Sequence, residues 1–230
     1  MTMPAVVTQE SVETQLLSYE GYLALPDDNR IIEWVEGEVI YHVPPTPAHQ
    51  DISMFLGALL RHYVHQLALG MVLAAPIEVK LWPDGPSREP DLLFVGNNKL
   101  NQIGDKRFDG PPDLVVEIIS PASLTLDRVT KFSEYESAGV GEYWIIDPRR
   151  YQQQADFYVR DAEGLFAPAP IDTNGVYASH MIPGFRLHVP WLWQTPFPNP
   201  QRALADMLAE APGLSDELRA AYRELRRLME

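Results

Sequence analysis

The run Leu114-Val115-Val116-Glu117-Ile118-Ile119 constrains the fold more than any other segment of the chain. Its side chains are apolar on both faces, which is typical of a central strand that other layers cover on both sides. One carboxylate, Glu117, interrupts the run. An ionised group in such a place is costly unless it is paired or binds a cation. The run therefore predicts a layered fold in which Glu117 either forms a structural salt bridge or carries a function.

The other segments predict an order of helices and strands around this central strand. Residues 30–41 have the pattern of a β-hairpin that turns at Glu36-Gly37. Apolar residues at helical spacing predict a helix over 48–68, and a second helix, which Ser123 or Thr125 can cap, is expected to end at Gly139. Strands are expected at 72–81, 91–95, 114–119, 142–147, 154–160, 165–168, 177–181 and 185–189, and a polar loop at 96–112. The order of helix, three strands, helix and strand indicates a mixed α/β (α+β) fold around one sheet.

The two ends of the chain differ from the middle. Residues 1–18 lack periodicity and are expected to be loose, so the predicted domain spans 19–195. A tail follows at 196–230, with three prolines that mark a linker and two amphipathic helices, at 203–210 and 215–229. The helix at 215–229 is marginal alone at this length and must dock on something. The sequence leaves two partners open for it: a second subunit, or its own domain.

Charge and composition disfavour several classes of protein. The net charge is −14, and phosphate contacts need Lys and Arg, so a general nucleic-acid-binding protein is disfavoured. Half of the acidic excess lies in residues 1–45, however, so the rest of the chain stays compatible with a local DNA site. There is no cysteine for a disulfide or a thiolate metal site. No apolar run approaches a membrane span and the N-terminus lacks a secretory signal, so a cytoplasmic protein is expected.

Asp91 and Glu117 are the strongest candidates for a metal site. Asp91 stands at the start of an expected strand, where an aspartate alone is most often a cap or turn residue. If its strand neighbours the Glu117 strand, both carboxylates converge at one end of the sheet. Hard oxygen ligands in such a place suit Mg²⁺ or Mn²⁺.

Lys131, His49 and Glu33 are weaker candidates when each is taken alone. Lys131 falls at the border of a predicted apolar stripe (Leu126, Val129, Phe132 and Tyr135), so its ammonium can reach the sheet edge. Asp127, four residues earlier, offers it an ordinary helical ion pair instead. His49 begins a helix, where a capping or packing role is the simpler interpretation. Glu33 lies on the expected hairpin, where a solvated acid is the simpler interpretation.

Five segments resemble, in order, the motifs of one protein family. They are Arg88-Glu89-Pro90-Asp91, residues 112–121 around Glu117, Asp127 to Lys131, Tyr135 to Val140, and Glu142 to Pro148. The family is the Uma-type restriction endonucleases of bacteria, a branch of the PD-(D/E)XK nuclease superfamily. The resemblance covers about 30–190, and the 33–39 hairpin and His49 also fit it.

The resemblance implies a PD-(D/E)XK core and assigns roles to residues. Pro90-Asp91 matches the PD element and Glu117 matches the D/E element. The superfamily's usual lysine position is occupied by Ile119, and the family is thought to supply its lysine from the next helix, where Lys131 matches. Glu78-Val79-Lys80 imitates the motif but precedes Pro90-Asp91, so we interpret it as part of a strand.

The same resemblance implies a mechanism. Asp91, Glu117 and the backbone carbonyl of Ile118 are expected to hold Mg²⁺ or Mn²⁺ against a phosphate oxygen. Lys131 is expected beside the attacking water, and His49 near a substrate phosphate. Relatives that cut both DNA strands commonly pair two active sites, which favours a homodimer.

Two functions follow from these observations. The first is a metal-dependent DNA endonuclease, which the intact set of Asp91, Glu117 and Lys131 favours. The second is a nuclease-derived binding or assembly protein, which the charge of −14 and the lack of a basic tract favour. A glycosidase with paired carboxylates is remote, because Lys131 would have no role in it.

Overall fold

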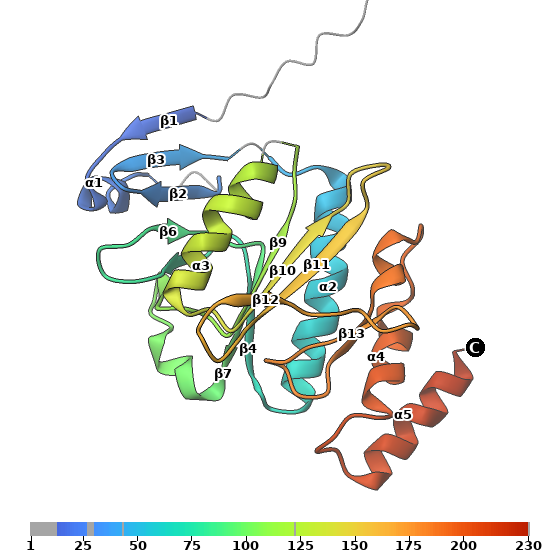
Figure 1. Cartoon of the computed structure of the whole chain (residues 1–230). Helices are drawn as coiled ribbons and strands as arrows, with labels where there is room; N and C mark the ends of the chain where they lie inside the picture. The colour runs from blue at the N-terminus through green and yellow to red at the C-terminus, as the bar shows by residue number, and fades with distance from the viewer. Residues whose placement is uncertain (1–12, 27–29, 43, 122, 230) are drawn as a thin grey trace, which may run out of the picture.

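The computed structural model describes residues 13–26, 30–42, 44–121 and 123–229, which form two six-stranded sheets with helices around them (Figure 1). The central sheet has the strand order β12-β11-β10-β9-β7-β4. These strands are β4 (Gly70–Ala74), β7 (Leu92–Gly96), β9 (Leu114–Ile118), β10 (Glu142–Asp147), β11 (Gln154–Arg160) and β12 (Phe166–Pro168). β9 and β10 are parallel and the other neighbours are antiparallel, so the sheet is mixed.

β9 lies inside the central sheet and is covered on both faces, as its apolar run predicts. All five of its residues are buried. Leu114, Val116 and Ile118 belong to the core on one side of the sheet, and Val115 belongs to the core on the other. Because side chains alternate along a strand, Glu117 lies on the same face as Val115. That face carries the candidate site.

A long helix, α2 (Pro47–Gln66), covers the opposite face of the central sheet (Figure 1). The helix begins after Thr46, whose hydroxyl accepts a hydrogen bond from the N–H of His49 at 3.2 Å. Pro47 fits the first turn because no intrahelical partner is needed for an N–H there. The helix expected over 48–68 is confirmed, and its apolar face is buried: Ile52, Phe55, Leu56, Leu59, Leu60, Tyr63 and Val64.

A helix in two parts covers the face that carries Glu117. Its first part, η2 (Leu126–Lys131), is π-helical, and its second part, α3 (Phe132–Ala138), is α-helical and ends at Gly139 with a φ of 95°. In a π-helix each hydrogen bond spans five residues, so the side chains advance less per residue than the 100° of an α-helix. The predicted apolar stripe is therefore wrong in its first turn: Val129 is 61% exposed, whereas Asp127 and Lys131 are buried.

The second sheet lies beside α3 and has the order β1-β3-β2-β6-β5-β8 (Figure 1). Its strands are β1 (Glu13–Leu16), β2 (Ile32–Val35), β3 (Glu38–Tyr41), β5 (Glu78–Lys80), β6 (Ser87–Arg88) and β8 (Arg107–Asp109), and a short helix, α1 (Tyr19–Leu23), follows β1. β2 and β3 confirm the predicted hairpin, whose turn residues Glu36 and Gly37 both have positive φ. β1 pairs with β3, so residues 13–16 form a strand where a loose segment was expected. Residues 1–12 lie outside the described part of the chain.

Two other expectations were wrong. The single strand expected over 72–81 is two strands, β4 and β5, which belong to different sheets. Pro76 lies between them, and proline lacks the N–H that would continue a ladder. The loop expected over 96–112 contains a 3₁₀ helix, η1 (Asn97–Gln102), and β8, which pairs in parallel with β5.

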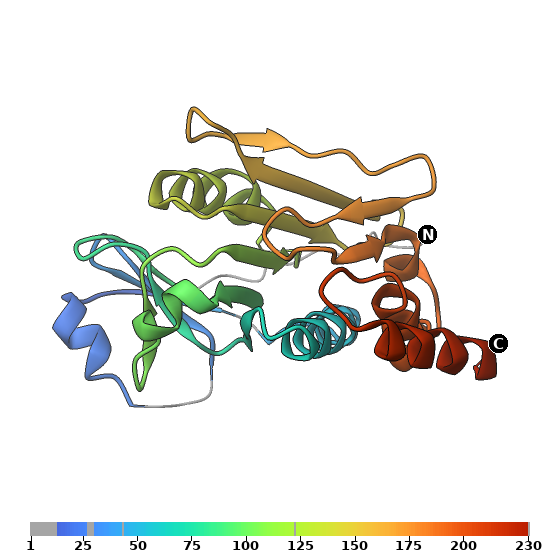
Figure 2. The ribbon, with the colours of Figure 1, turned by 90° about the horizontal axis from the view of Figure 1, so that it is seen from below.

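The C-terminal segments pack against α2 (Figure 2). They comprise the hairpin of β13 (Val176–Ala178) and β14 (Arg186–His188), the 3₁₀ helix η3 (Val189–Trp193), and the helices α4 (Pro200–Leu208) and α5 (Asp216–Leu228). Leu204, Met207 and Leu208 of α4 share one core with α2, so the prolines do not detach the tail. α5 is the helix for which the sequence left two partners open. Its Tyr222 packs against the same core, but none of its described residues is buried, so a second subunit as a further partner stays a prediction. No helix of the described residues combines the length and apolar character needed to cross a membrane.

Candidate active site

The register between β7 and β9 brings two carboxylates together. The strands are antiparallel, with Leu92 opposite Val116 and Leu93 opposite Val115. Continued by one residue, this register places Asp91 opposite Glu117, and the alternation of side chains gives both the same face. The N–H of Ile118 donates to Oδ2 of Asp91 at 2.7 Å, which fixes this carboxylate at the end of the strand pair.

Both carboxylates line a cavity of about 60 Å³. His49, Ile118 and Lys131 line it too, so all five residues predicted from the sequence surround one cavity, to which α2, β9 and η2 contribute. A volume of this size holds a few water-sized groups. Access is narrow, because Asp91 is 8% exposed, Glu117 4% and Lys131 3%.

His49 holds Asp91 from the first turn of α2. Its Nε2 lies 3.1 Å from Oδ2 of Asp91, and the imidazole is buried. The backbone of the same residue takes part in the helix cap through Thr46. His49 Nδ1 is buried, and no described residue gives it a hydrogen-bond partner. The capping interpretation is therefore right for the main chain, while the side chain belongs to the cavity.

Glu117 accepts two hydrogen bonds through one oxygen. Oε1 receives the ammonium of Lys131 at 2.9 Å and the hydroxyl of Tyr135 at 2.8 Å. Burial raises the pKa of Glu117 well above its usual range; Lys131 opposes this shift, while Asp127, Asp91 and Glu33 add to it. The ionised form of Glu117 thus meets more negative than positive charge around it, and a cation bound nearby would favour that form.

Lys131 lies among three carboxylates. Its ammonium is 2.9 Å from Oε1 of Glu117, 3.0 Å from Oε1 of Glu33 and 3.6 Å from Oδ1 of Asp127. Burial alone would lower the pKa of Lys131, but the three carboxylates raise it well above its usual value. Lys131 therefore stays protonated. The helical ion pair with Asp127, which the sequence offered as the simple alternative, is the longest of the three contacts.

Glu33 and Arg88 are the site residues that sequence reasoning missed. The interpretation of Glu33 as a solvated acid was wrong, because its side chain is fully buried. Its Oε2 lies 2.9 Å from Nη1 of Arg88, which is buried as well and forms a fork of two hydrogen bonds with Glu134. Although burial opposes it, Lys131 and Arg88 hold the pKa of Glu33 well below its usual range. Only the position of Arg88, next to the Pro90-Asp91 element, could have hinted at this role.

The oxygen atoms around the cavity suit a small divalent cation. Within the described residues, no hydrogen bond engages Oδ1 of Asp91 or Oε2 of Glu117, so each carboxylate retains an oxygen for a ligand. No three His, Asp or Glu side chains of that part of the chain gather into a complete metal site. A cation here would need backbone oxygen and water in addition. Ile118, whose carbonyl the family resemblance implies as a ligand, also lines the cavity. Mg²⁺ accepts such a set, because it usually keeps several waters and takes one or two carboxylates.

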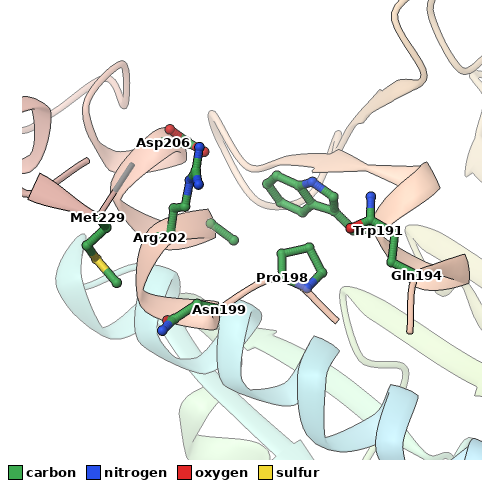
Figure 3. A pocket seen from close by; sticks show the side chains of 8 residues that line it. Trp191, Gln194, Pro198, Asn199, Arg202, Asp206 and Met229 are labelled. Carbon is green, nitrogen blue, oxygen red and sulfur yellow. The ribbon is translucent and has the colours of Figure 1, made fainter. Parts of the chain in front are cut away.

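A larger cavity lies far from these carboxylates in the fold, between η3, α4 and the end of α5 (Figure 3). It has a volume of about 510 Å³, and Trp191, Arg202 and Asp206 are among its lining residues. None of the residues of the carboxylate cluster lines it. We place the candidate site at the smaller cavity, because that is where buried charges converge.

Comparisons with known proteins identify the family and the fold. A family model described as "Putative restriction endonuclease" (Uma2) matches residues 19–190. The crystal structure of a putative nuclease belonging to DUF820 from Anabaena variabilis ATCC 29413 is similar, with a TM-score of 0.57 and 16% identity over 76% of this chain and 96% of that chain. At this identity the likeness shows the fold alone, which is the restriction-endonuclease-like core expected from the sequence. A comparison with curated proteins found no match.

Proposed function

Since the chain belongs to the Uma2 family of restriction-endonuclease-like proteins, we propose that it is a metal-dependent DNA endonuclease that hydrolyses phosphodiester bonds. One observation carries the proposal: Asp91 and Glu117 line one cavity from paired strands, with the ammonium of Lys131 2.9 Å from Glu117. A structural salt bridge alone would need only the Glu117–Lys131 pair. It would not need a second carboxylate, held by His49, at the same cavity.

Asp91, Glu117 and the carbonyl of Ile118 would hold Mg²⁺ or Mn²⁺. A cation so bound lowers the pKa of a coordinated water and offsets the charge that develops on phosphate. His49 and the N–H of Ile118 orient Asp91. Lys131 offers its protonated ammonium to the attacking water or to a phosphate oxygen, where a fixed donor stabilises the transition state. A substrate phosphate would approach from the side of His49.

Purified protein on supercoiled plasmid DNA tests this proposal, with Mg²⁺, Mn²⁺ or EDTA and with Asp91→Asn as the matched inactive variant. We expect nicked or linear DNA with either metal, and none with EDTA or with Asp91→Asn. Sedimentation of the active protein would test whether it works as a homodimer, the arrangement expected for cleavage of both strands.

A nuclease-derived binding or assembly protein is the second candidate. The net charge of −14 favours it, because this charge repels DNA outside any local site. Absence of cleavage with both metals, or equal cleavage by Asp91→Asn, would reject the endonuclease and leave this candidate.

A further inference from the structure

Glu33 joins the N-terminal sheet to the candidate site. It lies on β2, outside the central sheet, yet none of its side chain is exposed. Its Oε1 lies 3.0 Å from the ammonium of Lys131, and its Oε2 lies 2.9 Å from Nη1 of Arg88 and 3.0 Å from Nε2 of His42. The N–H of Glu89 donates to Oε1 at 3.1 Å. A buried carboxylate with this many donors is held in one place.

Lys131 needs such a fixed partner if Glu117 binds a cation. In the structure described here, Oε1 of Glu117 and Oε1 of Glu33 share the ammonium almost equally, at 2.9 and 3.0 Å. A divalent cation on Glu117 would weaken its attraction for the ammonium and would itself repel the ammonium. Asp127 is a poor substitute, because its Oδ1 lies 3.6 Å away and has no hydrogen bond to any described residue.

We propose that Glu33 is a positioning residue that keeps the ammonium of Lys131 beside the cavity when Glu117 engages a divalent cation. This inference rests on the proposed function and adds separate roles for Glu117 and Glu33. Glu117 exchanges partners, whereas Glu33 does not, because Arg88 and His42 hold its other oxygen, Oε2, and the N–H of Glu89 donates to Oε1. The N-terminal hairpin is then part of the active site and not an appendage to it.

Three variants test the role of Glu33. Glu33→Gln keeps the size of the side chain and removes its charge, and Glu33→Asp keeps the charge but withdraws it by one methylene. Glu134→Gln is the matched control: Glu134 also binds Arg88, through two hydrogen bonds of 2.7 Å, and it forms no described contact with Lys131. Circular dichroism would establish that each variant is folded.

Two readouts are compared, the kinetics of plasmid cleavage and the affinity for Mn²⁺ by titration calorimetry. We expect Glu33→Gln to lower kcat about 10- to 100-fold with little change in KM, since a misplaced catalytic group costs rate more than binding. Glu33→Asp should regain part of this loss. Mn²⁺ affinity should fall about fivefold in Glu33→Gln, because the lysine then holds Glu117 more strongly. Glu134→Gln should change both readouts far less than Glu33→Gln does, because Glu134 has no described contact with Lys131 and does not line the cavity.

The outcomes separate this inference from the proposed function. If wild type cleaves DNA and binds Mn²⁺, but Glu33→Gln behaves like Glu134→Gln, Glu33 is a structural residue and the inference is wrong. If wild type neither cleaves DNA nor binds Mn²⁺, the proposed function fails and the inference fails with it. Should Glu33→Gln not fold, Glu33→Asp decides: a kcat equal to that of wild type would reject the positioning role.

Discussion

Replacing Lys131 by methionine should destabilise the protein far more than the same replacement of a partly exposed lysine. Methionine fills a similar volume but leaves Glu33, Glu117 and Asp127, all buried, without the ammonium that now lies within 3.6 Å of each. Removal of one partner from a buried ion pair costs about 3–5 kcal/mol. In a domain of this size each kcal/mol lowers Tm by about 2–4 °C, so Tm should fall by about 6–20 °C.

Urea denaturation in EDTA at pH 8 measures this cost without a contribution from metal. Lys99→Met is the control, because Lys99 forms an ion pair of similar length with Asp113, 2.8 Å, but both side chains are about one fifth exposed. Loss of the Lys99–Asp113 ion pair should lower the free energy of unfolding by about 1 kcal/mol or less. The deficit of Lys131→Met should shrink at pH 5, where the unpaired carboxylates can take up protons. Equal stabilities of Lys131→Met and wild type at pH 8 would refute the charge arrangement described here.

Three other variants test the roles of Glu117, Glu89 and the C-terminal tail. Glu117→Gln should leave the free energy of unfolding without metal within about 1 kcal/mol of wild type, because the amide oxygen can still accept hydrogen bonds from Lys131 and Tyr135. The same variant should bind Mn²⁺ more weakly in calorimetry. A large loss of stability would instead indicate a purely structural salt bridge. Burial and the Glu33 charge raise the pKa of Glu89 to about 8. The folded state therefore keeps a proton that the unfolded state releases, and wild type should lose stability relative to Glu89→Gln as pH rises from 5 to 8 in EDTA. A 1–196 truncation should unfold non-cooperatively or aggregate, because it removes the core residues of α4; cooperative unfolding at the wild-type Tm would show that the tail is dispensable.

The pair of Asp91 and Glu117 could be predicted from the sequence because its determinants are local. Two short apolar runs predicted the strands, and the order of motifs indicated the family. The structure adds the antiparallel register that sets one carboxylate opposite the other. Burial alone does not identify a carboxylate of the site. Glu142 on β10 is also fully buried, but it accepts hydrogen bonds from Trp144, Tyr177 and Ser179 and does not line the cavity.

The remaining errors arose where burial and strand pairing depend on residues distant in the sequence, or where the helix is not a regular α-helix. Glu33 lies 55 positions before Arg88, and nothing in its own segment distinguishes a buried hairpin carboxylate from a solvated one. Val129 was placed on the buried face because an α-helical period was assumed where the chain is π-helical. That altered turn is also what buries Asp127 and Lys131 together. Residues 72–81 divide at Pro76 into β4 and β5, which belong to different sheets. The strands that pair with β4 and β5 lie elsewhere in the chain, so the segment alone does not reveal the division.

Anomalous diffraction from crystals grown with Mn²⁺ would show whether this cavity is a metal site. We expect one strong peak within about 2.0–2.6 Å of a carboxylate oxygen of Asp91, a carboxylate oxygen of Glu117 and the carbonyl oxygen of Ile118. We also expect the ammonium of Lys131 to stay in contact with Glu33 in those crystals. If the cavity shows no peak at saturating Mn²⁺, or if the metal is bound only by residues elsewhere, the cavity is not a metal site.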